Sequence, residues 1–198
     1  MTLLLVMSLV SRVGFAVLGG PCMSENSVDY GLTREIDFNR PAWGTSGAIQ
    51  VDWLFDSGFG AGVQFGIMFD SFEWAAESEY IRRTGSVKEG NLSAIGRYSM
   101  EMGPLRPYIG CGVGTHWGSY TYTYSHSDST THSNSDGLSG TLGLSLIAGL
   151  DVAIHDGLFG RMEASYHHVP RSSFPGWLVQ EVDHIDRVDF HVGLGFRP

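Results

Sequence analysis

The chain has 198 residues, which suits one domain, and 17% of them are charged, below the roughly 25% of ordinary soluble domains. Its 27 glycines and 12% aromatic residues are typical of an all-β protein and argue against a helical one. A net charge of −9 argues against a nucleic-acid partner, and no apolar run reaches the ~20 residues of a membrane-spanning helix.

The N-terminal segment supports two interpretations. Residues 1–16 hold a short apolar run, and Gly14-Phe15-Ala16 puts small residues where a signal peptidase cleaves, although no basic residue precedes the run. We therefore predict a signal peptide over 1–16 and a barrel domain over 17–198. The stretch from Arg12 to Met23 also alternates apolar with other residues, and so does the stretch from Ser27 to Phe38. Either stretch is a candidate for the first strand.

Seven further strands are predicted from the alternation of apolar residues with polar residues or glycine. They cover residues 47–55, 59–72, 91–103, 108–120, 141–155, 158–169 and 189–198. Short turns are expected at 56–58, 104–107 and 156–157, because Ser-Gly, Pro and Asp-Gly sequences stand there. Polar loops are expected over 73–90, 125–139 and 170–183.

The predicted strands are long, and short connections alternate with long ones. Both features are typical of a transmembrane barrel, in which short periplasmic turns alternate with longer outer loops. We therefore predict an all-β fold, an antiparallel up-and-down transmembrane β-barrel of about eight strands. The alternative is a soluble, lipocalin-like ligand-binding barrel with its apolar face inside. Glycines on the polar face and the near absence of lysine from the strands argue against that alternative.

The polar face of the strands predicts a lumen filled by side chains, because a barrel of about eight strands has room for little else. We expect the polar network of this lumen to contain Asp52, Gln64, Arg97, Glu101, Asp151, Arg161, Glu163, Asp189 and His191. Aromatic residues near the strand ends predict girdles at the two membrane interfaces. The residues expected in these girdles are Trp53, Phe59, Trp117 and Phe196.

One strand carries a candidate for chemistry. Glu163, Ser165 and His167 recur at every second position and therefore share the lumen face. Their spacing of about 6.5–7 Å along the strand is too long for a preformed hydrogen-bonded triad, so we interpret them as ordinary lumen residues. The alternative is a barrel-embedded lipid hydrolase similar to the lipid A deacylases. We predict neither a cofactor nor a metal site.

Three segments resemble the small outer-membrane β-barrel proteins of Gram-negative bacteria, the OmpA/OmpX/OmpW-like class. They are V-D-W-L-F-D-S-G-F-G-A-G-V-Q-F-G at 51–66, P-Y-I-G-C-G-V-G at 107–114 and V-D-F-H-V-G-L-G-F-R-P at 188–198. The last resembles the C-terminal strand that the barrel-assembly machinery reads, although Arg197 and Pro198 follow the aromatic Phe196.

This resemblance implies a porin-like, monomeric protein of the cell outer membrane. It implies contact with outer-membrane lipid and lipopolysaccharide, and with the barrel-assembly machinery during biogenesis. The implied role is structural or surface-interacting, carried by the extracellular loops and without enzymatic activity.

Overall fold

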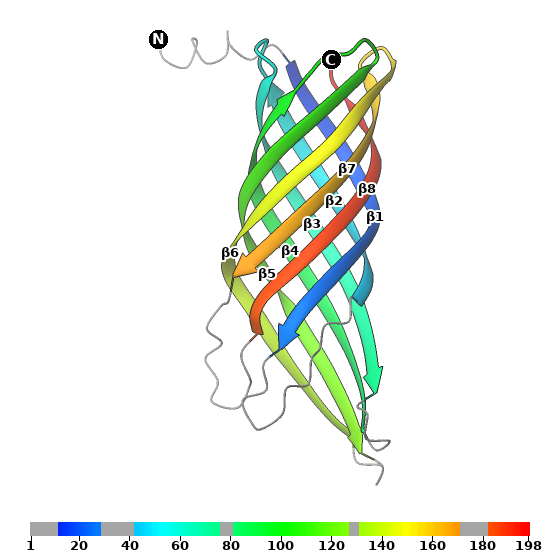
Figure 1. Ribbon diagram of the computed structural model, residues 1–198, viewed down its shortest axis with the longest axis vertical. Coiled ribbons are helices and arrows are strands. Elements are labelled where there is room, and N and C mark those ends of the chain that lie inside the picture. The colour runs from blue at the N-terminus through cyan, green and yellow to red at the C-terminus, as the bar shows by residue number, and fades with distance from the viewer. Residues whose placement is uncertain (1–11, 29–41, 76–80, 127–130, 171–181) are drawn as a thin grey trace.

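The computed structural model describes residues 12–28, 42–75, 81–126, 131–170 and 182–198. Side chains are described for 12–23, 43–71, 86, 88–119, 140–169 and 186–198. The described chain forms one closed antiparallel barrel in which each strand pairs with its neighbours in sequence order (Figure 1). The strands are β1 (Arg12–Val28), β2 (Ala42–Leu54), β3 (Phe59–Ala75), β4 (Ile81–Ser99), β5 (Leu105–His126), β6 (Thr131–His155), β7 (Leu158–Pro170) and β8 (Val182–Phe196).

The predicted fold class is confirmed, and the structure settles which segment is the first strand. β1 begins at Arg12 and pairs with β2 from Arg12↔Leu54 and with β8 from Phe15↔Phe196. The alternative first strand from Ser27 to Phe38 is wrong, because Arg12–Val28 already closes the barrel between β2 and β8. Residues 29–38 lie outside the described residues. Residues 12–16, the end of the predicted signal peptide, lie within β1. The signal peptide itself stays a prediction.

Three short turns define one end of the barrel, which we call the turn end. Gly58 and Gly157 adopt φ values of 85° and 81° there, which glycine adopts without the steric cost of a Cβ. Asp156 precedes Gly157 at a φ of 41°, so the Asp-Gly pair forms the tight turn expected from the sequence. The turn between β4 and β5 is tighter than expected: Met102 N donates to Leu105 O at 2.9 Å, and β5 already begins at Leu105.

Two predicted loops are largely strand. β3 continues to Ala75 and β4 starts at Ile81, within the segment 73–90 that was expected to be a loop. β5 continues to His126 and β6 starts at Thr131, within the expected loop 125–139. Polar composition misled the prediction, because strand pairing depends on backbone hydrogen bonds as well as on the burial of apolar side chains. Among the described residues, no helix is long and apolar enough to cross a membrane.

The two faces of the barrel wall have opposite polarity. On β6 the side chains of Leu142, Leu144 and Leu146 are 62%, 60% and 63% exposed. Ser145, which lies between two of these leucines, and Ile147, which follows the last, are buried. Among the described side chains, the outward positions of the strands carry no Lys, Arg, Asp or Glu near the turn end or in the middle of the barrel. The first charged residues on the outward face are Lys88 on β4 and Asp186 on β8, far from the turn end. The soluble, lipocalin-like alternative is therefore wrong, since such a barrel would expose the polar face.

The outward apolar surface forms a belt of the height expected for a membrane. On β3 it runs from Phe59 to Phe69, which corresponds to roughly 33 Å of strand at about 3.3 Å per residue. A strand tilt of about 40° reduces that length to a height of about 25 Å, which matches the apolar band of outer-membrane barrels. The belt therefore lies in the bilayer, and short turns of this kind are typical of the periplasmic end of such barrels.

Candidate functional site: the polar interior

Arg161 is the centre of a charged cluster near the turn end. This β7 side chain is completely buried, and its Nε and Nη2 donate to the two carboxylate oxygens of Asp151 on β6 at 2.7 and 2.9 Å. Its Nη1 donates to Asp52 Oδ2 on β2 at 3.0 Å. The paired contact with Asp151 is the bidentate geometry that makes arginine–carboxylate pairs strong and directional. One guanidinium thus ties β7 to β6 and, across the lumen, to β2.

Two more arginines complete the cluster. Arg97 Nη1 lies 3.0 Å from Asp52 Oδ2, and Arg197 Nη2 donates to Asp151 Oδ2 at 3.0 Å. We call the set Asp52, Arg97, Asp151, Arg161, Glu163 and Arg197 the turn-end cluster. Its three arginines and three carboxylates balance one another in formal charge. Such balance matters because an unpaired charge in a confined, dry space costs several kcal/mol.

Tyr108 joins this cluster, although the sequence reasoning did not single it out. Its hydroxyl donates to Glu163 Oε2 at 2.6 Å, and the guanidinium carbons of Arg97 and Arg161 lie 5.2 and 5.1 Å from its ring centroid. Gln50 Nε2 donates to the same Glu163 at 2.9 Å. The sequence contained the information needed, because Tyr108 lies an even number of positions from the inward glycines of β5 and therefore points to the same face.

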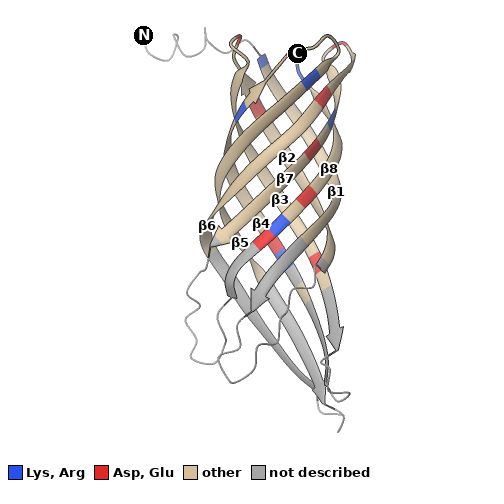
Figure 2. Cartoon of the chain, viewed as in Figure 1, with Lys and Arg blue, Asp and Glu red and all other residues tan. Residues whose placement is uncertain are grey.

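A second group of charges lies farther from the turn end, and we call it the far-end cluster: Glu89, His116, His167, Arg187 and Asp189. Arg187 Nη1 donates to Glu89 Oε1 at 2.9 Å, and its Nε lies 3.1 Å from Asp189 Oδ1. Glu89 Oε1 also lies 2.6 Å from His116 Nδ1. Figure 2 shows a basic residue between two acidic residues on β8, which are Arg187 between Asp186 and Asp189 in the sequence.

The far-end cluster contains two residues that the sequence reasoning missed. Glu89 was expected in a solvated loop and Arg187 was not considered, yet they are 4% and 3% exposed. Both have the parity of inward residues on their own strands, Asn91 on β4 and Asp189 on β8. A glycine makes room for this group, because a Cβ on Gly143 would lie 2.6 Å from His116 Nε2.

The structure brings eight of the nine expected lumen residues inside the barrel. Asp52, Gln64, Arg97, Asp151, Arg161, Glu163, Asp189 and His191 are all buried. Glu101 is a correction: its side chain is 68% exposed and pairs with Arg106 at the turn end. The reason is local, because β4 ends at Ser99 and strand alternation no longer decides where Glu101 points. His191 Nε2 lies 2.8 Å from Ser46 Oγ, outside both clusters.

The candidate hydrolase residues do not assemble as a triad. Ser165 Oγ lies 3.1 Å from His167 Nε2, closer than strand spacing alone suggested, whereas Glu163 binds Tyr108 and Gln50 instead. Asp189 Oδ2 lies 3.2 Å from the same Nε2. A serine hydrolase needs the nucleophile on one imidazole nitrogen and the orienting acid on the other. Here both contacts share Nε2, Nδ1 has no described hydrogen-bond partner, and Ser165 is 1% exposed.

The expected interfacial aromatics lie on the outward face of the barrel, three of them near the turn end. Phe59 and Phe196 are 60% and 50% exposed near the turn end, and the Phe59 ring centroid lies 5.0 Å from that of Tyr98. Trp53 is partly exposed at the same edge. Trp117 lies farther along β5, with its ring centroid 6.3 Å from that of Phe65. Among the described residues, no group of three or more His, Cys, Asp or Glu is placed to hold a metal ion.

Known structures share this architecture. The sequence matches no protein-family model and no curated protein sequence. The outer membrane protein OprG from Pseudomonas aeruginosa superposes with a TM-score of 0.54 at 13% identity, over 93% of this chain and 95% of that one. The outer membrane protease OmpT from Escherichia coli gives 0.53 at 8% identity, over 96% and 97% of the two chains. Neisserial surface protein A gives 0.51 at 13% identity, over 92% and 96%.

At these identities the likeness shows a shared fold and nothing about activity. The orientation of the faces comes from this chain itself, since the outward positions along the belt are apolar and the charged side chains of the two clusters are buried inside the barrel. A closed barrel with an apolar belt, a polar interior and short turns at one end is the architecture of outer-membrane proteins. The chain is therefore an integral, eight-stranded β-barrel of the outer membrane, with the fold of the small outer-membrane barrels.

Proposed function

We propose that this barrel has a plugged lumen and serves a structural or surface-interacting role, without catalysing a reaction. The observation that carries the proposal is the turn-end cluster, in which Arg161 joins β7 to β6 through Asp151 and, across the lumen, to β2 through Asp52. We expect side chains that meet across the lumen to block the path of hydrated solutes. The lack of an accessible triad at Ser165 and His167 supports a non-enzymatic role.

Conductance tests the plugged lumen. The refolded barrel is expected to produce no stable, porin-sized channels in planar bilayers, because the turn-end cluster fills its cross-section. Arg97→Ala, which removes a buried side chain from the lumen, is expected to raise the leak current. Glu101→Gln is the matched control, because Glu101 lies outside the lumen. Large, long-lived channels in the unmodified protein would contradict the proposal.

The surface role is supported by strands that continue beyond the belt. β4 and β5 stay paired from Lys88↔Ser119 to Ile81↔His126, which corresponds to roughly 23 Å along the strands. Figure 1 shows β3, β4, β5 and β6 extending past the ends of the other four strands. Together with the connections that join them, these ends present the chain to lipopolysaccharide and to partners outside the cell. We further propose that the protein is a monomer and that the barrel-assembly machinery reads β8.

Epitope accessibility tests this orientation. A short tag inserted between residues 128 and 129 is expected to bind antibody on intact cells, because β5 ends and β6 starts at the end opposite the turns. The same tag inserted after Gly103, in the β4–β5 turn, is expected to bind only after the outer membrane is permeabilised. Labelling of the second variant on intact cells would reverse the proposed orientation.

A further inference from the structure

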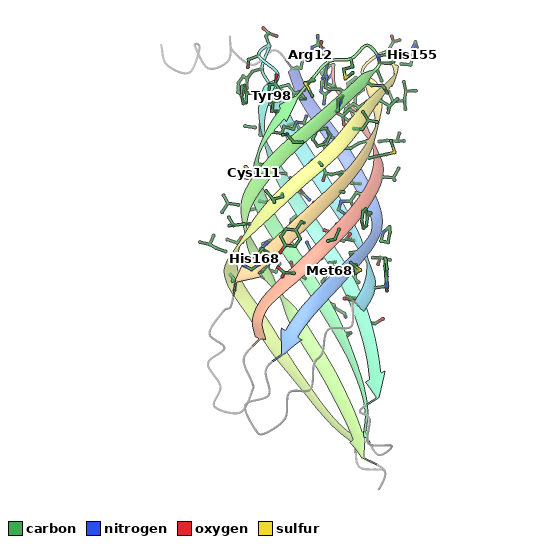
Figure 3. All side chains as sticks on the ribbon, in the orientation of Figure 1. Arg12, Met68, Tyr98, Cys111, His155 and His168 are labelled. Carbon is green, nitrogen blue, oxygen red and sulfur yellow. The ribbon has the colours of Figure 1, made fainter. Side chains whose placement is uncertain are left out.

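A cavity of about 420 Å³ opens at the turn end, outside both charged clusters. It lies between the β2–β3 turn and the β4–β5 turn, and Arg12 at the start of β1 forms a third side. The residues that matter for its chemistry are Arg12, Asp56, Tyr98, Glu101 and Arg106. In Figure 3, Arg12 and Tyr98 are labelled at this end of the barrel, far from Met68 and His168. This volume is within the range of small-ligand sites.

The cavity carries charges of both signs. Arg106 pairs with Glu101, and Arg12 Nη1 lies 3.8 Å from Glu101 Oε1, too far for a hydrogen bond. One carboxylate is therefore shared by two guanidinium groups, and a second carboxylate, Asp56, lines the same cavity. The two positive and two negative charges cancel. A ligand that carries both signs complements this lining better than a simple ion, because an anion or a cation alone would bring its charge close to two lining groups of the same sign.

The cavity adjoins the edge of the lipid-facing belt. Tyr98 lines it and is also 40% exposed toward the outside of the barrel, with its ring beside that of Phe59. Met100, which also lines the cavity, is 52% exposed. A molecule bound here thus has its charged part among the turns and an apolar path down the belt. That position is the headgroup level of the periplasmic leaflet, given the orientation of the barrel.

We propose that this cavity binds the headgroup of a zwitterionic phospholipid that carries a primary ammonium group, as phosphatidylethanolamine does. The phosphate accepts hydrogen bonds from Arg106 and Arg12, because a planar guanidinium group can donate to two oxygens of one phosphate. The ammonium group donates hydrogen bonds to Glu101 and Asp56. Glu101 is free to turn from arginine to ammonium, because its side chain is 68% exposed in a turn. The site rests on the proposed orientation of the barrel, which the epitope tags test separately, and not on the proposed surface role.

Native mass spectrometry of the folded barrel in detergent, with lipids of identical acyl chains, tests the site. Phosphatidylethanolamine is expected to be retained more than phosphatidylcholine, whose quaternary ammonium donates no hydrogen bond, and more than phosphatidylglycerol, which lacks a positive charge. Arg106→Ala is expected to weaken phosphatidylethanolamine retention about tenfold, as the loss of a charge-assisted hydrogen bond implies. The double variant Asp56→Asn/Glu101→Gln is expected to prefer phosphatidylglycerol, because only the arginines remain charged.

The matched control is Asp156→Asn. Asp156 pairs with His155 at 2.9 Å on the β6–β7 turn, and both side chains are largely exposed outside the cavity. Heat-modifiable gel migration confirms that each variant is folded, and the exposed double variant decides the question if Arg106→Ala does not fold. Equal retention of the three lipids, an unchanged preference in the double variant or an equal effect of Asp156→Asn would each overturn the proposal. Equally tight binding of soluble glycerophosphoethanolamine would overturn the assignment to a membrane lipid.

Discussion

Replacing Arg161 by methionine is expected to lower the free energy of unfolding by about 3–5 kcal/mol, the usual cost of breaking a buried ion pair by removing one partner. The substitution leaves Asp151 and Asp52 buried without the donors that now meet them at 2.7 to 3.0 Å. Urea unfolding of the refolded barrel in lipid vesicles, followed by heat-modifiable migration, measures the change. Methionine keeps most of the apolar volume of the arginine side chain, so the loss of unfolding free energy measures chiefly the missing charge interactions.

The triple variant Asp52→Asn/Asp151→Asn/Arg161→Met is the control for that interpretation. It removes both carboxylate charges together with the arginine, and replacing the members of a buried ion network is often close to neutral. Arg97 and Arg197 lose their partners in the triple variant, so we expect it to recover part of the loss and not all of it. A cost below about 1 kcal/mol for Arg161→Met alone, the value of an exposed pair, would show that the cluster is hydrated.

Replacing Leu146 by arginine is expected to lower the free energy of unfolding by about 2–4 kcal/mol, the cost of an arginine on the lipid face at the bilayer midplane. Leu146 is 63% exposed near the middle of the outward face of β6. The cost arises because the guanidinium group must either enter hydrocarbon or thin the bilayer around it. The same urea unfolding in vesicles measures it.

Ile154→Arg is the matched control on the same strand and the same face. Ile154 is 56% exposed next to the β6–β7 turn, where an arginine side chain reaches the interface, so the expected cost is only about 0–1 kcal/mol. A dependence on depth is the signature of a bilayer. Equal costs for the two variants would be inconsistent with a belt that spans the membrane along β6.

Alternation along single strands was the part of this protein that could be predicted. The inward or outward position of Asp52, Arg161 and Asp189 follows from parity, because a strand turns successive side chains to opposite faces whatever it pairs with. The same rule fails at Glu101, which lies beyond the end of β4. It was not applied to Glu89 and Arg187, because polar composition had assigned their segments to loops or loop edges. Strand ends, more than strand faces, were therefore the weak point of the prediction.

The all-β class, the two faces of each strand, the Asp-Gly turn and the inward direction of most charges could be predicted from the sequence, since all of these depend on neighbours within a few residues. The closure of the barrel by β1 from Arg12 against β8, and the contacts of Arg161 with Asp151 and Asp52, required the three-dimensional fold. The fold also decided that Glu89 and Arg187 form a buried pair although 98 positions separate them. These contacts depend on the register of the strands around the closed barrel. That register is set by the pairing of all eight strands together, so it cannot be predicted from any single strand.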